Sequence, residues 1–189
     1  ELVQHLISFT GQEAKVWKKY GKVVREIVKS YFSGRPESVC HDNGYIWSYK
    51  AGVALSWMNA YVEGRPVTER CGYQVETNCF WYNALSFVAQ MEPASALGKM
   101  CAATKKKIEE TFMDMFWVEE RHHLADFVNS EGKNVFTRPN QLYACSLPNS
   151  PVSEEVRSMI LKAVSRELVT SRGIRTLSPK NPIYRSHYE

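Results

Sequence analysis

The sequence lacks the features that mark several large classes of protein. No run of apolar residues approaches the roughly 20 that a membrane span needs. Basic residues form no long tract, and a formal charge of +4 from 24 Lys and Arg against 20 Asp and Glu gives no reason to expect nucleic acid as a partner. The densest basic cluster, Lys105 to Lys107, precedes Glu109 and Glu110, which predicts a solvated helix face with i,i+4 ion pairs.

Cysteine is also sparse, and its pattern excludes the common cysteine-based sites. The five cysteines are odd in number and widely spaced, without a C-x-x-C pair to suggest zinc or redox chemistry. His122 and His123 are adjacent, point in different directions on a helix and lack a third ligand nearby, so a surface pair is predicted. We therefore expect no metal and no cofactor, and reduced thiols in a cytoplasmic protein.

The ends of the sequence show no natural boundary. The chain begins at Glu1 without an initiator methionine or a signal-like segment, and it ends at Glu189 directly after an aromatic run. With 44% hydrophobic residues, the 189 residues are enough for one core. We expect residues 1–189 to form a single segment of a domain, cut at both ends.

Three stretches have the apolar spacing of amphipathic helices. In Gln12 to Ser33, Val16, Tyr20, Val23, Ile27 and Tyr31 recur at helical intervals. Ala94 to Phe116 repeats the pattern, and so does Ser153 to Val169, where Ser153 can cap the N-terminus. Each of these helices is expected to bury one face.

Two other stretches are apolar on almost every side. Val75 to Gln90 must be buried over most of its circumference, and its long polar residues Glu76, Asn83 and Gln90 fall on one narrow stripe. The short run from Leu142 to Leu147, which Pro148 ends, predicts a second buried helix. Amphipathic helices that alternate with apolar ones suggest an all-α toroid of inner and outer helices, with a plain helical bundle as the alternative.

A long irregular stretch separates the first helix from the apolar helix. Residues 35–73 contain turn sequences such as Asp42-Asn43-Gly44 and Glu63-Gly64-Arg65-Pro66. Their aromatic residues are not typical of a disordered linker, and long loops within compact domains usually carry function. We expect this loop to carry the active-site motif.

Several motifs in this loop and beyond it are similar to those of one known family. The stretch Leu55 to Ala60 (L-S-W-M-N-A) resembles the L-T-W-M-D-A of the amylo-α-1,6-glucosidase domain in glycogen debranching enzymes. Val67 to Arg70 (V-T-E-R) resembles its V-T-P-R. Further matches follow in the family's order to about Tyr188: G-Y-Q-V-E at 72–76, F-W-Y-N-A-L at 80–85, F-W at 116–117, L-A-D at 124–126, R-P-N-Q at 138–141, S-L-P at 146–148 and G-I-R-T-L at 173–177.

The resemblance implies a fold, a reaction and a partner. It implies part of a six-fold α/α barrel, completed by the remainder of the same barrel, that hydrolyses α-1,6-linked glucose in an α-glucan with inversion. Inversion requires a carboxylic acid to protonate the leaving oxygen and a carboxylate to activate water. Asn59 occupies the family's acid position, and an amide has no acidic proton to give. No stretch of this chain matches the motif of the family's base.

Other residues are candidates for catalysis or for binding sugar. Glu63, Glu69 and Glu76 could each supply a substitute carboxylate, and Glu76 is the best placed, at the start of the apolar helix. The alternative for Glu76 is an ion pair with Arg70. Trp57, in the loop, suits stacking on a sugar, whereas Trp81 in mid-helix could stack on sugar or belong to the core.

A polar group precedes the second apolar run. Arg138, Asn140 and Gln141 would lie at the rim of a barrel and could donate to sugar hydroxyls, with capping and loop bracing as the alternative. Asp126 resembles a position on the same rim.

Three functions remain open from the sequence. The first is a segment of a debranching-type α-1,6-glucosidase, supported by the ordered motifs. The second is a glucan-binding relative without catalysis, supported by Asn59. The third is a helical interaction domain, which leaves the long aromatic loop unexplained.

Overall fold

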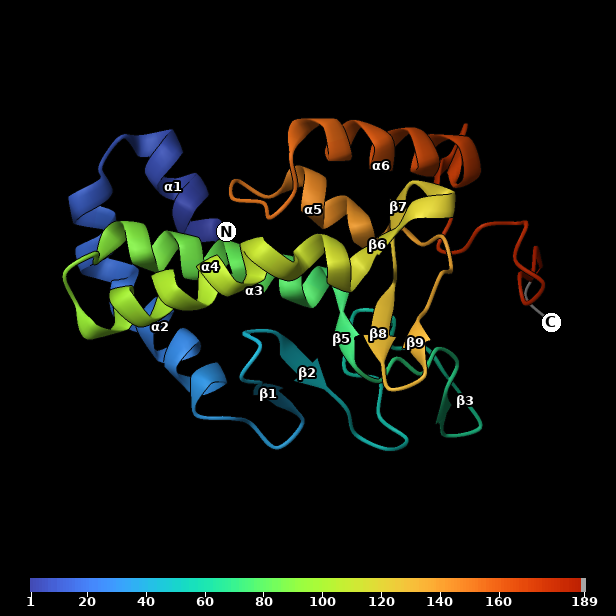
Figure 1. Cartoon of the computed structure of the whole chain (residues 1–189), viewed down its shortest axis with the longest axis horizontal. Coiled ribbons are helices and arrows are strands. Elements are labelled where there is room, and N and C mark those ends of the chain that lie inside the picture. Colours follow the sequence, from blue (N-terminus) through green and yellow to red (C-terminus); the bar gives the residue numbers. More distant parts are fainter. Residues whose placement is uncertain (188–189) are drawn as a thin grey trace.

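A computed structural model describes residues 1–187 of the chain, so the end of the family resemblance at Tyr188 lies outside the described residues. Helices account for about half of the described residues (Figure 1). Their bounds are α1 Leu2–Thr10, α2 Glu13–Phe32, α3 Val75–Met91, α4 Ala96–Phe116, α5 Tyr143–Ser146 and α6 Glu154–Glu167. The long helices confirm the predicted helical stretches to within about two residues at their ends.

Helices α3 and α4 lie side by side at the centre of the molecule, with α1 and α2 toward one end and α5 and α6 along the other (Figure 1). The short connection between α3 and α4 requires Gly98, because a Cβ there would lie 1.9 Å from the carbonyl oxygen of Glu92. Ser95 caps α4 by accepting a hydrogen bond from the Gly98 amide at 2.9 Å. The core includes fully buried side chains of both helices: Cys79, Leu85, Val88, Ile108, Phe112 and Phe116.

Short strands accompany the helices, so the expectation of an all-α chain was wrong in this respect. Each strand spans two or three residues and every pair is antiparallel. Stretches this short cannot show the alternation of apolar and polar residues by which strands are recognised in a sequence. The strands are β1 Ser38–Cys40, β2 Ile46–Ser48, β3 Tyr61–Val62, β4 Arg65–Pro66, β5 Tyr73–Gln74, β6 Trp117–Val118, β7 His123–Leu124, β8 Phe127–Asn129, β9 Gly132–Lys133, β10 Val169–Thr170 and β11 Gly173–Ile174.

The buried face of α2 differs from the predicted one. Val16 and Val28 are buried, but Val23 and Ile27 are 55% and 51% exposed. Helix α1 is apolar yet has no buried residue. Together with Leu2, which is 84% exposed, Val23 and Ile27 form what we call the α1–α2 apolar surface.

The predicted second buried helix is shorter than expected. A 3-10 turn at Pro139–Leu142 leads into α5, which has only four residues, and Leu147 follows in extended conformation. Ala144 and Leu147 are buried. The apolar run therefore fills the core with a single turn of helix.

Two local predictions are confirmed and one is wrong. Lys105 and Lys106 pair with Glu109 and Glu110 at 2.9 and 3.8 Å, and the Ser153 hydroxyl accepts from the Val156 amide to cap α6. The His122–His123 surface pair is wrong for His123, which is 1% exposed because β6 and β7 pair and turn its ring inward. Within residues 1–187, no helix combines the length and apolar character needed to cross a membrane.

Candidate active site

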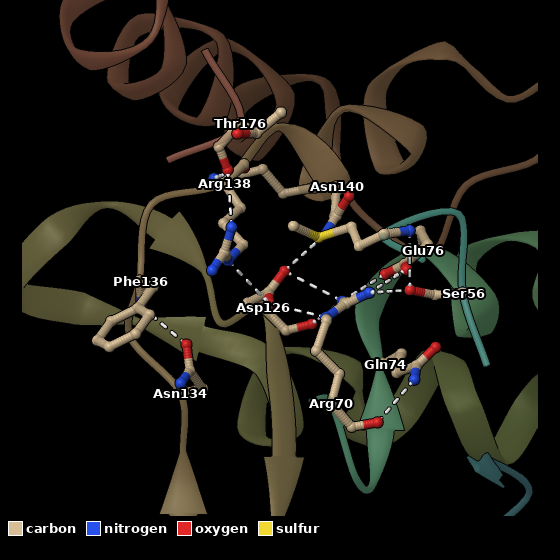
Figure 2. Close-up of polar contacts among 12 residues, drawn as sticks. Ser56, Arg70, Gln74, Glu76, Asp126, Asn134, Phe136, Arg138, Asn140 and Thr176 are labelled. Atoms are coloured by element: carbon tan, nitrogen blue, oxygen red, sulfur yellow. Dashed lines mark hydrogen bonds and ion pairs between the residues drawn. The ribbon is translucent and has the colours of Figure 1, made fainter. Parts of the chain in front are cut away.

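Four segments that are distant in the sequence meet beside the N-terminus of α3 (Figure 2). They are the loop at Ser56, the stretch from Arg70 to Glu76, the residue Asp126 and residues 138–140. Strand β5 pairs with β8 in the register Tyr73↔Val128 and Gln74↔Phe127, which brings the start of α3 against Asp126. The Val75 amide donates to the Asp126 carbonyl at 3.1 Å. Gly72 permits this approach, because its φ is +126° and a Cβ would lie 2.3 Å from the Val128 carbonyl oxygen.

Arg70 is the centre of this arrangement, lying between two carboxylates (Figure 2). Its Nε and Nη2 atoms donate to the two oxygens of Asp126 at 2.8 and 3.0 Å. Its Nη1 and Nη2 atoms donate to the two oxygens of Glu76, the Nη2 bond measuring 2.7 Å. Nη2 also donates to the Asp126 carbonyl at 2.9 Å. The side chains of Arg70, Glu76 and Asp126 are only 2%, 6% and 1% exposed. They form a buried ion cluster in which Arg70 binds each carboxylate through two hydrogen bonds.

A second cation balances the charges of the cluster. Arg138 Nε lies 3.5 Å from Asp126 Oδ2, and Arg138 Nη1 donates to the Thr176 carbonyl at 3.0 Å. Burial alone would lower the pKa of Arg70, but its bonds to Glu76 and the charge of Asp126 outweigh burial and raise that pKa. Burial lowers the pKa of Arg138, and the charge of Asp126 opposes this effect. Two guanidinium groups therefore neutralise two carboxylates.

The ion cluster answers a question that the sequence left open. Glu76 is in an ion pair with Arg70, as the alternative interpretation held. Both oxygens of Glu76 and both oxygens of Asp126 accept from Arg70. Their negative charges are thus engaged within the cluster, and neither carboxylate is arranged to donate a proton to a substrate.

Asn140 and Gln141 are also buried, each 1% exposed. Asn140 Nδ2 donates to Asp126 Oδ1 at 2.7 Å, and Asn140 Oδ1 accepts from Trp57 Nε1 at 2.8 Å. Gln141 accepts from the Leu124 amide at 3.1 Å and donates to the Arg138 carbonyl at 3.0 Å. The hydrogen bonds of both residues thus brace the protein, as the alternative for this polar group proposed.

The loop of residues 55–60, which we call the motif loop, lies against this cluster. Ser56 Oγ accepts from Arg70 Nη1 at 3.4 Å, and Met58 Sδ accepts from Asn140 Nδ2 at 3.5 Å. Trp57 is 51% exposed even though its ring nitrogen is bonded to Asn140. Asn59 is exposed. The motif loop therefore presents Trp57 and Asn59 to solvent, whereas Ser56 and Met58 contact the buried cluster and the Ala60 carbonyl accepts from the Val67 amide.

A cleft of about 490 Å³ opens beside the cluster. Asp126 and Arg138 line it together with Met58 from the motif loop, Glu69, Phe136 and Tyr184. Glu69 and Glu63 are both exposed. Glu63 lies on the β3–β4 turn, where its φ is +49°. No sequence motif pointed to Phe136 and Tyr184, and only the fold brings these aromatic residues to the cleft.

Trp81 lies apart from these residues. It is 4% exposed, donates to the Gly44 carbonyl at 3.0 Å and contacts the ring of Phe32 with centroids 5.0 Å apart. This is the core position that the sequence left as one alternative. In residues 1–187, no three His, Cys, Asp or Glu side chains are grouped so as to hold a metal ion.

The entire chain, residues 1–189, matches the family model described as amylo-alpha-1,6-glucosidase. The chain belongs to the amylo-alpha-1,6-glucosidase family. This is a family of glycoside hydrolases of the glycogen-debranching type. The motifs that carry the family resemblance supply Trp57, Arg70, Glu76, Asp126, Arg138 and Asn140, which the fold brings together.

A solved structure has the same fold. The crystal structure of a GH78 family rhamnosidase of Bacillus sp. GL1 superposes with a TM-score of 0.60 at 18% identity. The match covers 92% of this chain and 17% of the rhamnosidase chain, so the family member described here spans less than a fifth of that enzyme's length. None of the curated proteins compared with the chain matches it.

Proposed function

We propose that this chain is a segment of a debranching-type glycoside hydrolase domain that acts on α-1,6-linked glucose in glycogen or a related α-glucan. The observation that carries the proposal is the convergence of the family's motifs beside one cleft. In this proposal, the helices form part of a six-fold α/α barrel, and the remainder of that barrel completes the cleft. The free cysteines support a reducing location such as the cytoplasm.

Trp57 is the residue best arranged to bind sugar. Its flat ring is half exposed, and the bond from its nitrogen to Asn140 limits how the ring can turn. An aromatic face of this kind matches the C–H face of a pyranose ring. The charged and polar groups that line the cleft add acceptors and donors for sugar hydroxyls.

The proposed reaction inverts the anomeric centre. It needs a carboxylic acid and a carboxylate about 6.5–9.5 Å apart, with water between the carboxylate and the sugar. Asn59 stands at the acid position of the motif, where its amide can donate a hydrogen bond to a glycosidic oxygen but cannot protonate it. The base would come from the rest of the barrel. We therefore expect the segment alone to be inactive.

A second candidate is a glucan-binding relative that lacks catalysis, and Asn59 is the observation in its favour. With Glu76 and Asp126 engaged by Arg70, the remaining carboxylate that lines the cleft is Glu69, which is exposed. If the protein hydrolyses glucan with Asn59 in place, Glu69 is the residue to test as the substitute proton donor.

The deciding experiment measures glucose release from a 6-O-α-glucosyl maltooligosaccharide by the full protein, with Asn59 and with Asn59→Asp. We expect Asn59→Asp to raise the rate by at least about 100-fold, the order of magnitude of general acid catalysis, while oligosaccharide binding changes little. Glu69→Gln tests the alternative donor: it should lower the rate of the protein with Asn59 only if Glu69 supplies the proton. If the protein with Asn59 already hydrolyses at the rate of the Asn59→Asp variant, the assignment of position 59 is refuted, and absence of binding by both would refute a glucan function.

A further inference from the structure

We infer that Asn140 is a positioning residue that holds in place the motif loop, whose Met58 lines the cleft, and thereby residue 59. The inference rests on the proposed function for its consequence in glucan binding, but its structural basis is independent of any ligand. Asn140 is buried and lies 83 positions from Trp57 in sequence. Its side chain makes two of its three polar contacts to the motif loop.

The carboxylate of Asp126 fixes the orientation of the Asn140 amide. The Asp126 carboxylate can only accept hydrogen bonds, so the NH2 end of Asn140 must face it, as the 2.7 Å distance between Nδ2 and Oδ1 shows. Asp126 is itself held by Arg70 through both of its oxygens. The carbonyl end of the amide is therefore directed away from Asp126.

That carbonyl end selects a donor on the motif loop. It accepts from Trp57 Nε1 at 2.8 Å, and the indole nitrogen of tryptophan can only donate. Phenylalanine has a smaller ring and no such donor. The NH2 end of Asn140 also contacts the motif loop, because Asn140 Nδ2 lies 3.5 Å from Met58 Sδ. Asn140 thus contacts the two residues that precede position 59.

The exposed parts of the motif loop have few other anchors. Trp57 is half exposed and Asn59 is exposed, so packing against neighbours cannot define their positions as it does in the core. Ser56 adds one bond of 3.4 Å to Arg70, and the Ala60 carbonyl accepts from the Val67 amide at 2.9 Å. Loss of the Asn140 amide should therefore loosen residues 57–60 while the helices keep their structure.

Hydrogen–deuterium exchange of the full protein, without ligand, tests this inference. The Met58 amide donates to Ser56 Oγ at 3.3 Å and reports on the order of the loop. In Asn140→Ala, we expect exchange in residues 55–60 to be about tenfold faster, equivalent to about 1.4 kcal/mol at 25 °C. Exchange within α3 and α4 should change much less.

Asn83→Ala is the matched control. Asn83 is also 1% exposed and bonds to Gln4 and Asn149, but it lies farther along α3 and makes no hydrogen bond to the motif loop. It should leave exchange of residues 55–60 unchanged. Equal acceleration in both variants would mean that Asn140 is merely structural and would overturn the inference, as would no acceleration in Asn140→Ala.

Trp57→Phe keeps the inference testable if Asn140→Ala does not fold, because it removes the N–H donor at an exposed position and keeps an aromatic ring there. It should also speed exchange of the loop, and the double variant should be no faster than the faster single variant. Fully additive effects would overturn the inference. Glucan binding, measured separately, should weaken about tenfold in Asn140→Ala. A loosened loop in a protein that binds no glucan would refute the proposed function and leave the positioning role standing.

Discussion

Replacement of Arg70 by methionine should destabilise the protein strongly. Arg70, Glu76 and Asp126 are 2%, 6% and 1% exposed, so Arg70→Met leaves two carboxylates buried side by side with only Arg138 nearby, 3.5 Å from Asp126. Removal of one partner from a buried ion pair costs about 3–5 kcal/mol. This is a large share of the total of about 5–15 kcal/mol that stabilises a typical domain.

Urea unfolding followed by circular dichroism gives the magnitude. Arg25→Met is the matched control, because Arg25 pairs with Glu92 at 2.6 Å but the two side chains are 35% and 20% exposed, and such pairs contribute about 1 kcal/mol or less. The double variant Arg70→Met and Glu76→Gln should regain much of the lost free energy, because the buried charges that remain, Asp126 and Arg138, are paired with each other. If Arg70→Met lost no more than Arg25→Met, our account of the cluster would be wrong.

Two further predictions concern pH and self-association. Burial lowers the pKa of His123, so its neutral form stabilises the fold above the ordinary histidine pKa of about 6.5, and this contribution is lost as the pH falls below that value. The free energy of unfolding should therefore decrease less between about pH 7 and pH 5 in His123→Gln than in the unaltered protein; equal slopes would contradict this. Residues 1–189 expressed alone should self-associate through the α1–α2 apolar surface, and Val23→Lys with Ile27→Lys should shift the species in light scattering toward monomer, unlike Lys22→Glu on the same helix. A monomer without any substitution would contradict the partial-barrel interpretation.

The long helices could be predicted from the sequence because their periodicity extends over many turns. Val75–Met91 is apolar on nearly all sides, and burial on nearly all sides follows directly. Ser153 could be predicted as a cap because it lies just before the first turn of the helix, and this position lets its hydroxyl accept from the Val156 amide. The motifs also singled out three residues that meet in space: Arg70, Asp126 and Asn140.

The remainder depends on contacts between distant segments. His123 is buried because β7 pairs with β6, and a two-residue strand leaves no pattern in the sequence. The exposed side of α2 depends on which helices pack against it, which periodicity along one helix cannot reveal. Likewise, Asn140 is polar, as a residue at the rim of a barrel would be. Only its hydrogen bonds to Trp57 and Asp126 show that its side chain binds other parts of the protein.

The exposure of Asn59 has a consequence for how this protein could evolve. The bonds that anchor the motif loop use the side chains of Ser56, Trp57 and Met58 and the backbone carbonyl of Ala60, so stability places little constraint on the side chain at position 59. Asparagine and aspartate codons differ by a single nucleotide. Under the proposed function, a lineage could therefore exchange a catalytic acid for an amide, or reverse that exchange, in one mutational step and without first acquiring compensating substitutions. Loss of chemistry at this position would leave an intact scaffold on which selection for binding could continue to act.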